Sequence, residues 1–102
     1  MKVTGLETTI VNVPFKGEGA GSGRGGTTEV IVKLTADNGL VGWGESPGQL
    51  SSAAAIEATV RHIAPLIVGR DPWDREAIAR SFFRQGTTYR WTQMANFAFA
   101  GI

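Results

Sequence analysis

The sequence contains no cysteine, which excludes disulfides and thiolate metal sites. It has a single histidine, His62, so a metal site that needs two histidines is also excluded. No run approaches the roughly 20 apolar residues that a helix needs to cross a bilayer. The first fifteen residues lack the uninterrupted apolar core of a signal peptide. We therefore expect a cytoplasmic protein without a membrane partner.

The chain also lacks an excess of either charge, because ten basic residues stand against nine acidic ones. A net charge of +1 offers no electrostatic reason to expect nucleic acid as a partner. Hydrophobic residues make up 42% and charged residues 19%, which is ordinary for a globular protein and argues against disorder. The 102 residues suffice for one small domain, or for part of a larger one.

Glycine, by contrast, is abundant between Gly17 and Gly26, where the sequence reads GEGAGSGRGG. Gly21 to Gly26 matches the G-x-G-x-x-G pattern of dinucleotide sites, but such a site needs a helix after the glycines. A β-branched segment follows instead, so phosphate binding is disfavoured. The single Arg-Gly-Gly triplet at Arg24 is a weak signal for RNA, since such segments act by repetition and charge. Composition leaves two interpretations open, a flexible linker or a mobile lid over a ligand.

Three segments have the composition and alternation of β-strands. Between the second and third stands an Asn-Gly turn signal, Asp37 to Gly39, which accepts the positive φ angles of tight hairpins. The sequence therefore predicts an antiparallel three-stranded meander. Its strands are expected at Val3 to Pro14, Thr27 to Ala36 and Leu40 to Glu45.

After the third strand the hydrophobic period changes to that of an amphipathic helix. Ser51 or Ser52 is expected to cap its start, and Pro65 to break it near residues 63–64, with Gly69 closing the segment. The apolar stripe consists of Ile56, Val60, Ile63 and Ile67.

A second helix is expected to begin at Asp71, with that residue as N-cap and Pro72 at the first helical position. We expect this helix to run to about Gln85 and to stop at Gly86. Strands followed by about three helices predict an α+β fold.

The last segment, Trp91 to Ile102, is apolar in nearly every direction around a helix. Such a helix needs protein on all sides, and three strands with two other helices have too little mass to enclose it. It also ends without a cationic last turn or a polar stop. We therefore expect a truncated chain, in which residues 1–90 form one domain and residues 91–102 begin a helix that leads into a missing domain.

Two stretches in this order and spacing resemble a known family. Asp37 to Glu45 (DNGLVGWGE) and Ala64 to Pro72 (APLIVGRDP) are similar to the N-terminal capping domain of the enolase superfamily, in its mandelate racemase and muconate-lactonizing branch. The resemblance implies that a TIM barrel, absent from this chain, completes the enzyme. It also implies a Mg²⁺ ion held by three barrel carboxylates, which stabilises the enediolate formed when a barrel base removes a proton α to a carboxylate. No catalytic or metal-binding residue is then expected on this chain.

The resemblance further implies that two loops, Phe15–Gly26 and Ser46–Ser51, lie over the barrel mouth, which favours the lid interpretation of the glycines. The expected substrate-lid residues are Phe15, Arg24, Gln49 and Tyr89. The expected partners are the barrel domain, a small carboxylate or sugar-acid substrate, and further copies in a homo-oligomer. Sugar-acid dehydratase, racemase or epimerase, and cycloisomerase are the candidate reactions, in that order. The alternative is a stand-alone interaction module that docks through its apolar C-terminal helix.

Overall fold

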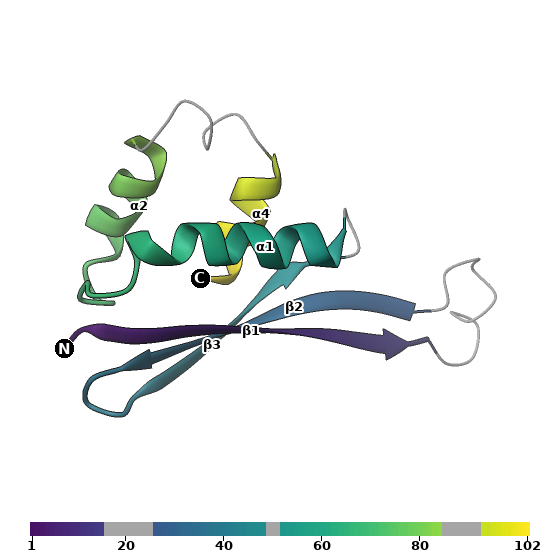
Figure 1. The fold of residues 1–102 in the computed structure, drawn as a ribbon, viewed down its shortest axis with the longest axis horizontal. Helices are drawn as coiled ribbons and strands as arrows, with labels where there is room; N and C mark the ends of the chain where they lie inside the picture. Colours follow the sequence, from purple (N-terminus) through teal and green to yellow (C-terminus); the bar gives the residue numbers. More distant parts are fainter. Residues whose placement is uncertain (16–25, 49–51, 85–92) are drawn as a thin grey trace.

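The computed structural model describes residues 1–15, 26–48, 52–84 and 93–102. It confirms the α+β class: a three-stranded antiparallel sheet in the order β1-β2-β3, with the helices stacked on one of its faces (Figure 1). The strands are β1 (Val3–Pro14), β2 (Gly26–Ala36) and β3 (Val41–Pro47). The helices are α1 (Ala53–Ile63), the short 3₁₀ helix η2 (Ala64–Leu66), α2 (Arg75–Arg84) and α4 (Gln93–Gly101).

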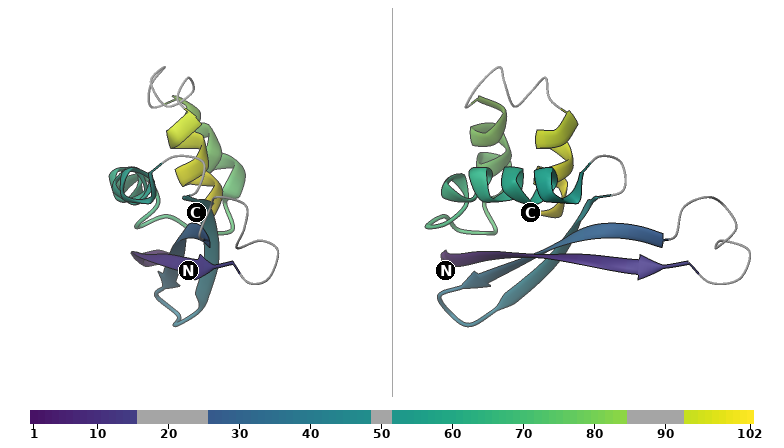
Figure 2. Two further views of the ribbon diagram at one scale, coloured as in Figure 1. Left: turned by 90° about the vertical axis from the view of Figure 1, so that its right-hand side faces the viewer. Right: turned by 45° about the vertical axis from the view of Figure 1, so that its right-hand side comes forward.

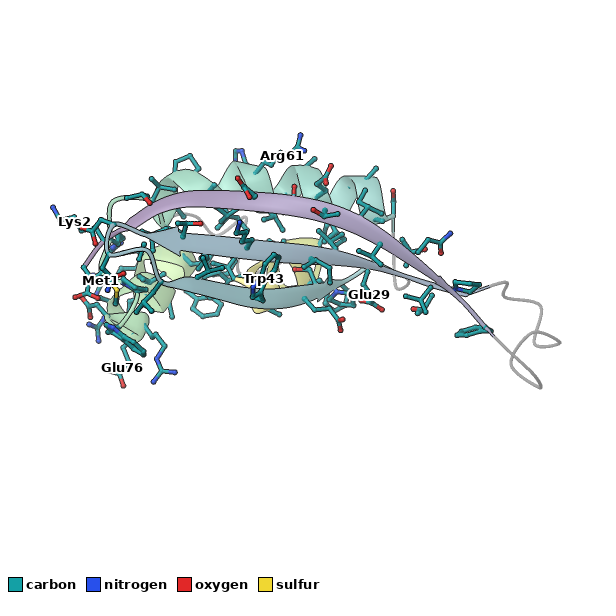
Figure 3. The ribbon with its side chains drawn as sticks, turned by 90° about the horizontal axis from the view of Figure 1, so that it is seen from below. Met1, Lys2, Glu29, Trp43, Arg61 and Glu76 are labelled. Atoms are coloured by element: carbon teal, nitrogen blue, oxygen red, sulfur yellow. The ribbon has the colours of Figure 1, made fainter. Side chains whose placement is uncertain are left out.

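The strand alternation predicted for β2 is confirmed, because Val30, Val32 and Ala36 are buried on the helix side. The opposite face of the sheet, seen in Figure 3, carries the charged and aromatic side chains of one cross-strand row. Glu7, Lys33 and Trp43 are paired in register across the three strands. The Lys33 ammonium lies 3.8 Å from a Glu7 carboxylate oxygen and 5.6 Å from the centre of the Trp43 ring.

The predicted turn joins β2 to β3. The Gly39 N–H donates to the Ala36 carbonyl, and Gly39 has a φ of 86°, in the left-handed region that glycine tolerates. Asn38 has no positive φ, so this is not the two-residue mirror-image turn that Asn-Gly most favours. Instead the Asn38 side chain accepts a hydrogen bond from the Leu40 N–H. The third strand therefore begins at Val41 and runs to Pro47, two residues beyond the predicted end.

The predicted stripe is confirmed, because Ile56, Val60 and Ile63 of α1 are buried and so is Ile67, which directly follows η2. Ser52 is the N-cap, and its side chain accepts a hydrogen bond from the Ala55 N–H. The α-helix ends at Ile63, and Pro65 lies in the 3₁₀ turn that follows. Gly69, with a φ of 91°, ends the segment, and its N–H donates to the Val3 carbonyl. This bond ties the end of the helix to the start of β1.

The predicted start of the second helix is wrong by several residues. Helix α2 begins at Arg75, and residues 71–74 form a turn instead. The Asp71 side chain accepts a hydrogen bond from the Trp73 N–H, and its carbonyl accepts one from the Asp74 N–H. A short acidic side chain bonded to the backbone two residues on competes with helix formation. The described helix reaches Arg84, and the predicted end at Gln85 and Gly86 lies outside the described residues.

Helix α4 is covered by its own domain on one side only. Ala95, Ala98 and Gly101 are buried against α1 and β3, whereas Phe99 and Ile102 are only half-buried. The Ser46 hydroxyl donates to the Ala98 carbonyl over 3.0 Å and joins the helix to β3. Small side chains allow this close approach. Trp91 lies outside the described residues, and the division of the chain at residue 90 stays a prediction.

One hydrophobic core joins the sheet to the helices, built mainly from β2, α1 and the inner sides of α2 and α4. The Phe82 ring of α2 is fully buried and stacks on Phe99 of α4, with ring centres 4.1 Å apart. Within the described part of the chain, no helix is long and apolar enough to cross a membrane.

Candidate functional site

The two predicted loops are anchored at the same end of the sheet. Pro14 pairs with Gly26 across β1 and β2, and Glu29 pairs with Pro47 across β2 and β3. Helix α1 begins just beyond β3, so its N-terminus lies at this end too (Figures 1 and 2). We call this end of the sheet the loop end. It brings together the residues that flank 16–25 and 49–51.

Two glycines make the loop end compact. A side chain at Gly26 would meet the Val13 carbonyl oxygen, and one at Gly48 would meet the Thr28 carbonyl oxygen. In both cases the obstacle is backbone that cannot move aside. Gly48 is buried, which places the end of β3 directly against β2. Glycine is therefore required at both positions by close backbone approach.

The polar side chains at the loop end form two short contacts, one between strands and one along β2. The Thr28 hydroxyl contacts the Asn12 side-chain oxygen at 3.2 Å. The Thr27 hydroxyl donates to one carboxylate oxygen of Glu29 at 3.0 Å. The second oxygen, Oε2, is buried and accepts no hydrogen bond from any described residue. The loop end thus contains one buried carboxylate oxygen without a hydrogen-bond donor among the described residues.

The structure places one of the four expected lid residues. Phe15 directly follows β1 at the loop end and is half-buried. Arg24, Gln49 and Tyr89 lie outside the described residues, so their roles stay predictions. Sequence reasoning missed Glu29, because strand alternation only assigns it to the face of the sheet opposite the helices. Nothing in the local sequence indicates that one of its oxygens is buried.

The described residues do not fit a magnesium site. Among them, no group of three or more histidine, aspartate or glutamate side chains lies close enough together to hold a metal ion. We therefore assign no metal ligand and no catalytic step to this part of the chain.

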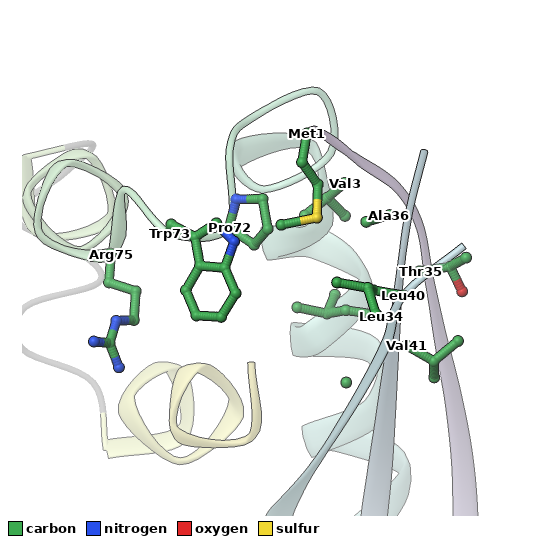
Figure 4. A pocket seen from close by; sticks show the side chains of 11 residues that line it. Met1, Val3, Leu34, Thr35, Ala36, Leu40, Val41, Pro72, Trp73 and Arg75 are labelled. Atoms are coloured by element: carbon green, nitrogen blue, oxygen red, sulfur yellow. The ribbon is translucent and has the colours of Figure 1, made fainter. Parts of the chain in front are cut away.

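An apolar groove lies at the other end of the molecule, between the β2–β3 hairpin, α2 and the C-terminal end of α4 (Figure 4). It comprises two adjoining cavities of about 240 and 390 Å³ that share Val3, Leu34, Pro72 and Arg75. Arg75 is the charged residue that lines both cavities. The groove is separate from the loop end and lacks the convergent polar groups of an active site.

Comparison with known families decides how these features are to be interpreted. Residues 6–102 match the model of the mandelate racemase / muconate lactonizing enzyme N-terminal domain. The chain belongs to this family. It is therefore an N-terminal capping domain of the enolase-superfamily type, as the two sequence stretches predicted, and the order of strands and helices agrees with that fold.

Enzymes of this superfamily are similar to the chain in sequence and structure. The L-Ala-D/L-Glu epimerase of Bacillus subtilis (strain 168) is 35% identical over 85 residues, which are 76% of this chain and 23% of the epimerase. Its substrate-liganded structure superposes on 85% of this chain and 26% of its own, at 33% identity and a TM-score of 0.69. The D-galactonate dehydratase of Xanthomonas campestris pv. campestris (strain B100) is 34% identical over 73 residues, 72% of this chain and 19% of the dehydratase.

A structure from Roseovarius nubinhibens ISM, described as a magnesium complex of this enzyme type, has the same fold. It covers 98% of this chain and 27% of its own, with a TM-score of 0.74 and 24% identity. The chain thus spans about a quarter of the length of the proteins that it matches.

Proposed function

We propose that this chain acts as the substrate-capping domain of a Mg²⁺-dependent enzyme that removes a proton α to a carboxylate. The observation that carries the proposal is the loop end. Within a domain of this family, the residues that flank the two proposed loops lie at one end of the sheet, and two of these residues, Gly26 and Gly48, have room only for glycine. Paired segments on a rigid scaffold are suited to close over a substrate held by a second domain and to exclude water from it.

The second domain is proposed to be a TIM barrel that supplies the metal ligands and the catalytic base. The similarity to enzymes of which the matched part is only about a quarter supports that partner. When bound, the metal would stabilise the negative charge that develops after proton removal. This chain's own contribution is to enclose and select the substrate.

We infer a small carboxylate or sugar acid as the substrate. Similarity to a D-galactonate dehydratase supports a dehydratase reaction on a sugar acid, and similarity to a dipeptide epimerase supports the racemase or epimerase reaction. Phe15, Arg24, Gln49 and Tyr89 remain the proposed substrate contacts of the lid. Cytoplasmic location and homo-oligomer formation also stay predictions.

A domain exchange tests the proposal. Residues 1–102 replace the equivalent cap of the Bacillus subtilis epimerase, and exchange of the substrate α-proton with deuterium is followed by NMR. We expect the chimera to catalyse Mg²⁺-dependent exchange with an altered preference among dipeptides and sugar acids. The barrel without any cap should exchange slowly with every substrate, because water is not excluded from it.

A second chimera carrying Gly48→Val provides the control. A valine at position 48 would meet the Thr28 backbone and should push the chain that follows β3 away from β2. It should lose substrate preference while the barrel still binds Mg²⁺. If the chimera without the substitution folds but has the same preference as the uncapped barrel, the capping role is contradicted.

A further inference from the structure

We draw no further inference here: the strongest candidate, the apolar groove between the β2–β3 hairpin, α2 and the C-terminal end of α4, carries nothing because no feature of the described residues shows what covers it.

Discussion

At the scale of single residues, Gly44 and Gly101 show that glycine can be required for close packing of two backbones rather than for a turn. Neither residue has a positive φ, yet a Cβ on Gly44 would meet the Gly101 carbonyl oxygen. A Cβ on Gly101 would meet the Ser46 hydroxyl. The helix backbone therefore rests directly on β3, and Ser46 donates to Ala98 within the same contact. A larger residue at either glycine has no room unless the helix moves.

Gly44→Ala should accordingly lower the free energy of unfolding by about 1–3 kcal/mol, the usual cost of overpacking. Gly42→Ala is the control, since a Cβ there meets nothing within 4 Å and its φ is not positive. It should be neutral, or stabilising by about 0.4–1 kcal/mol through the unfolded state. Urea denaturation of both variants measures the difference. Equal midpoints would show that α4 does not rest on β3 in solution.

At the scale of elements, helices α1 and α2 differ in how well the local sequence predicts where they begin. Ser52 lies directly before α1 and accepts from the Ala55 N–H, so a local sequence signal and the observed cap agree. Asp71 carries an equally strong local signal, but its side chain bonds to Trp73 in a turn and the helix begins at Arg75. The Arg70 carbonyl accepts a hydrogen bond from the Val3 N–H, and the Arg70 guanidinium donates one to the Ser81 hydroxyl. These tertiary bonds are invisible to a local pattern.

Ser52→Ala should lower the free energy of unfolding by about 1 kcal/mol, because one N–H of the first helical turn loses its acceptor. Ser52→Asp should retain most of the stability, since aspartate caps equally well and its charge suits a helix N-terminus. The readout is again the urea midpoint, with helical content followed by circular dichroism. A loss that Ser52→Asp fails to rescue would argue that the serine acts through packing rather than capping.

At the scale of the whole molecule, apolar surface is concentrated around the groove at the hairpin end. Trp73 lines the groove and exposes 70% of its surface, and neighbouring Leu40 exposes 56%. Contiguous exposed apolar surface of this kind binds hydrophobic dyes and marks contacts with other protein. Arg75 adds a cation at the same place.

An anionic naphthalene sulfonate dye should therefore fluoresce with the folded chain. Trp73→Gln should reduce that signal several-fold, because it removes the largest exposed apolar side chain of the groove. Val68→Gln, at an exposed valine that does not line the groove, is the control and should have little effect. Fluorescence titration at constant protein concentration measures both. Equal loss in the two variants would mean that the dye binds without preference for the groove.

Much of this fold follows from the sequence alone, because its signals are local. Alternation in β2, the apolar stripe of α1, the serine cap, the proline break and the glycine turn each depend on neighbours within a few residues. The family could be identified for the same reason, since the stretches that carry the resemblance are two continuous segments. The proposed enzyme class rests on that identification, not on any residue described at the loop end.

What only the tertiary structure decided involves residues far apart in the chain. Gly101 meets Gly44, Ser46 donates a hydrogen bond to Ala98, and one Glu29 oxygen is buried. The last helix is apolar nearly all round in sequence, yet the structure buries only the side carrying its smallest residues. The reason is physical: composition and periodicity report how apolar each face is, whereas burial also depends on how closely two backbones can approach.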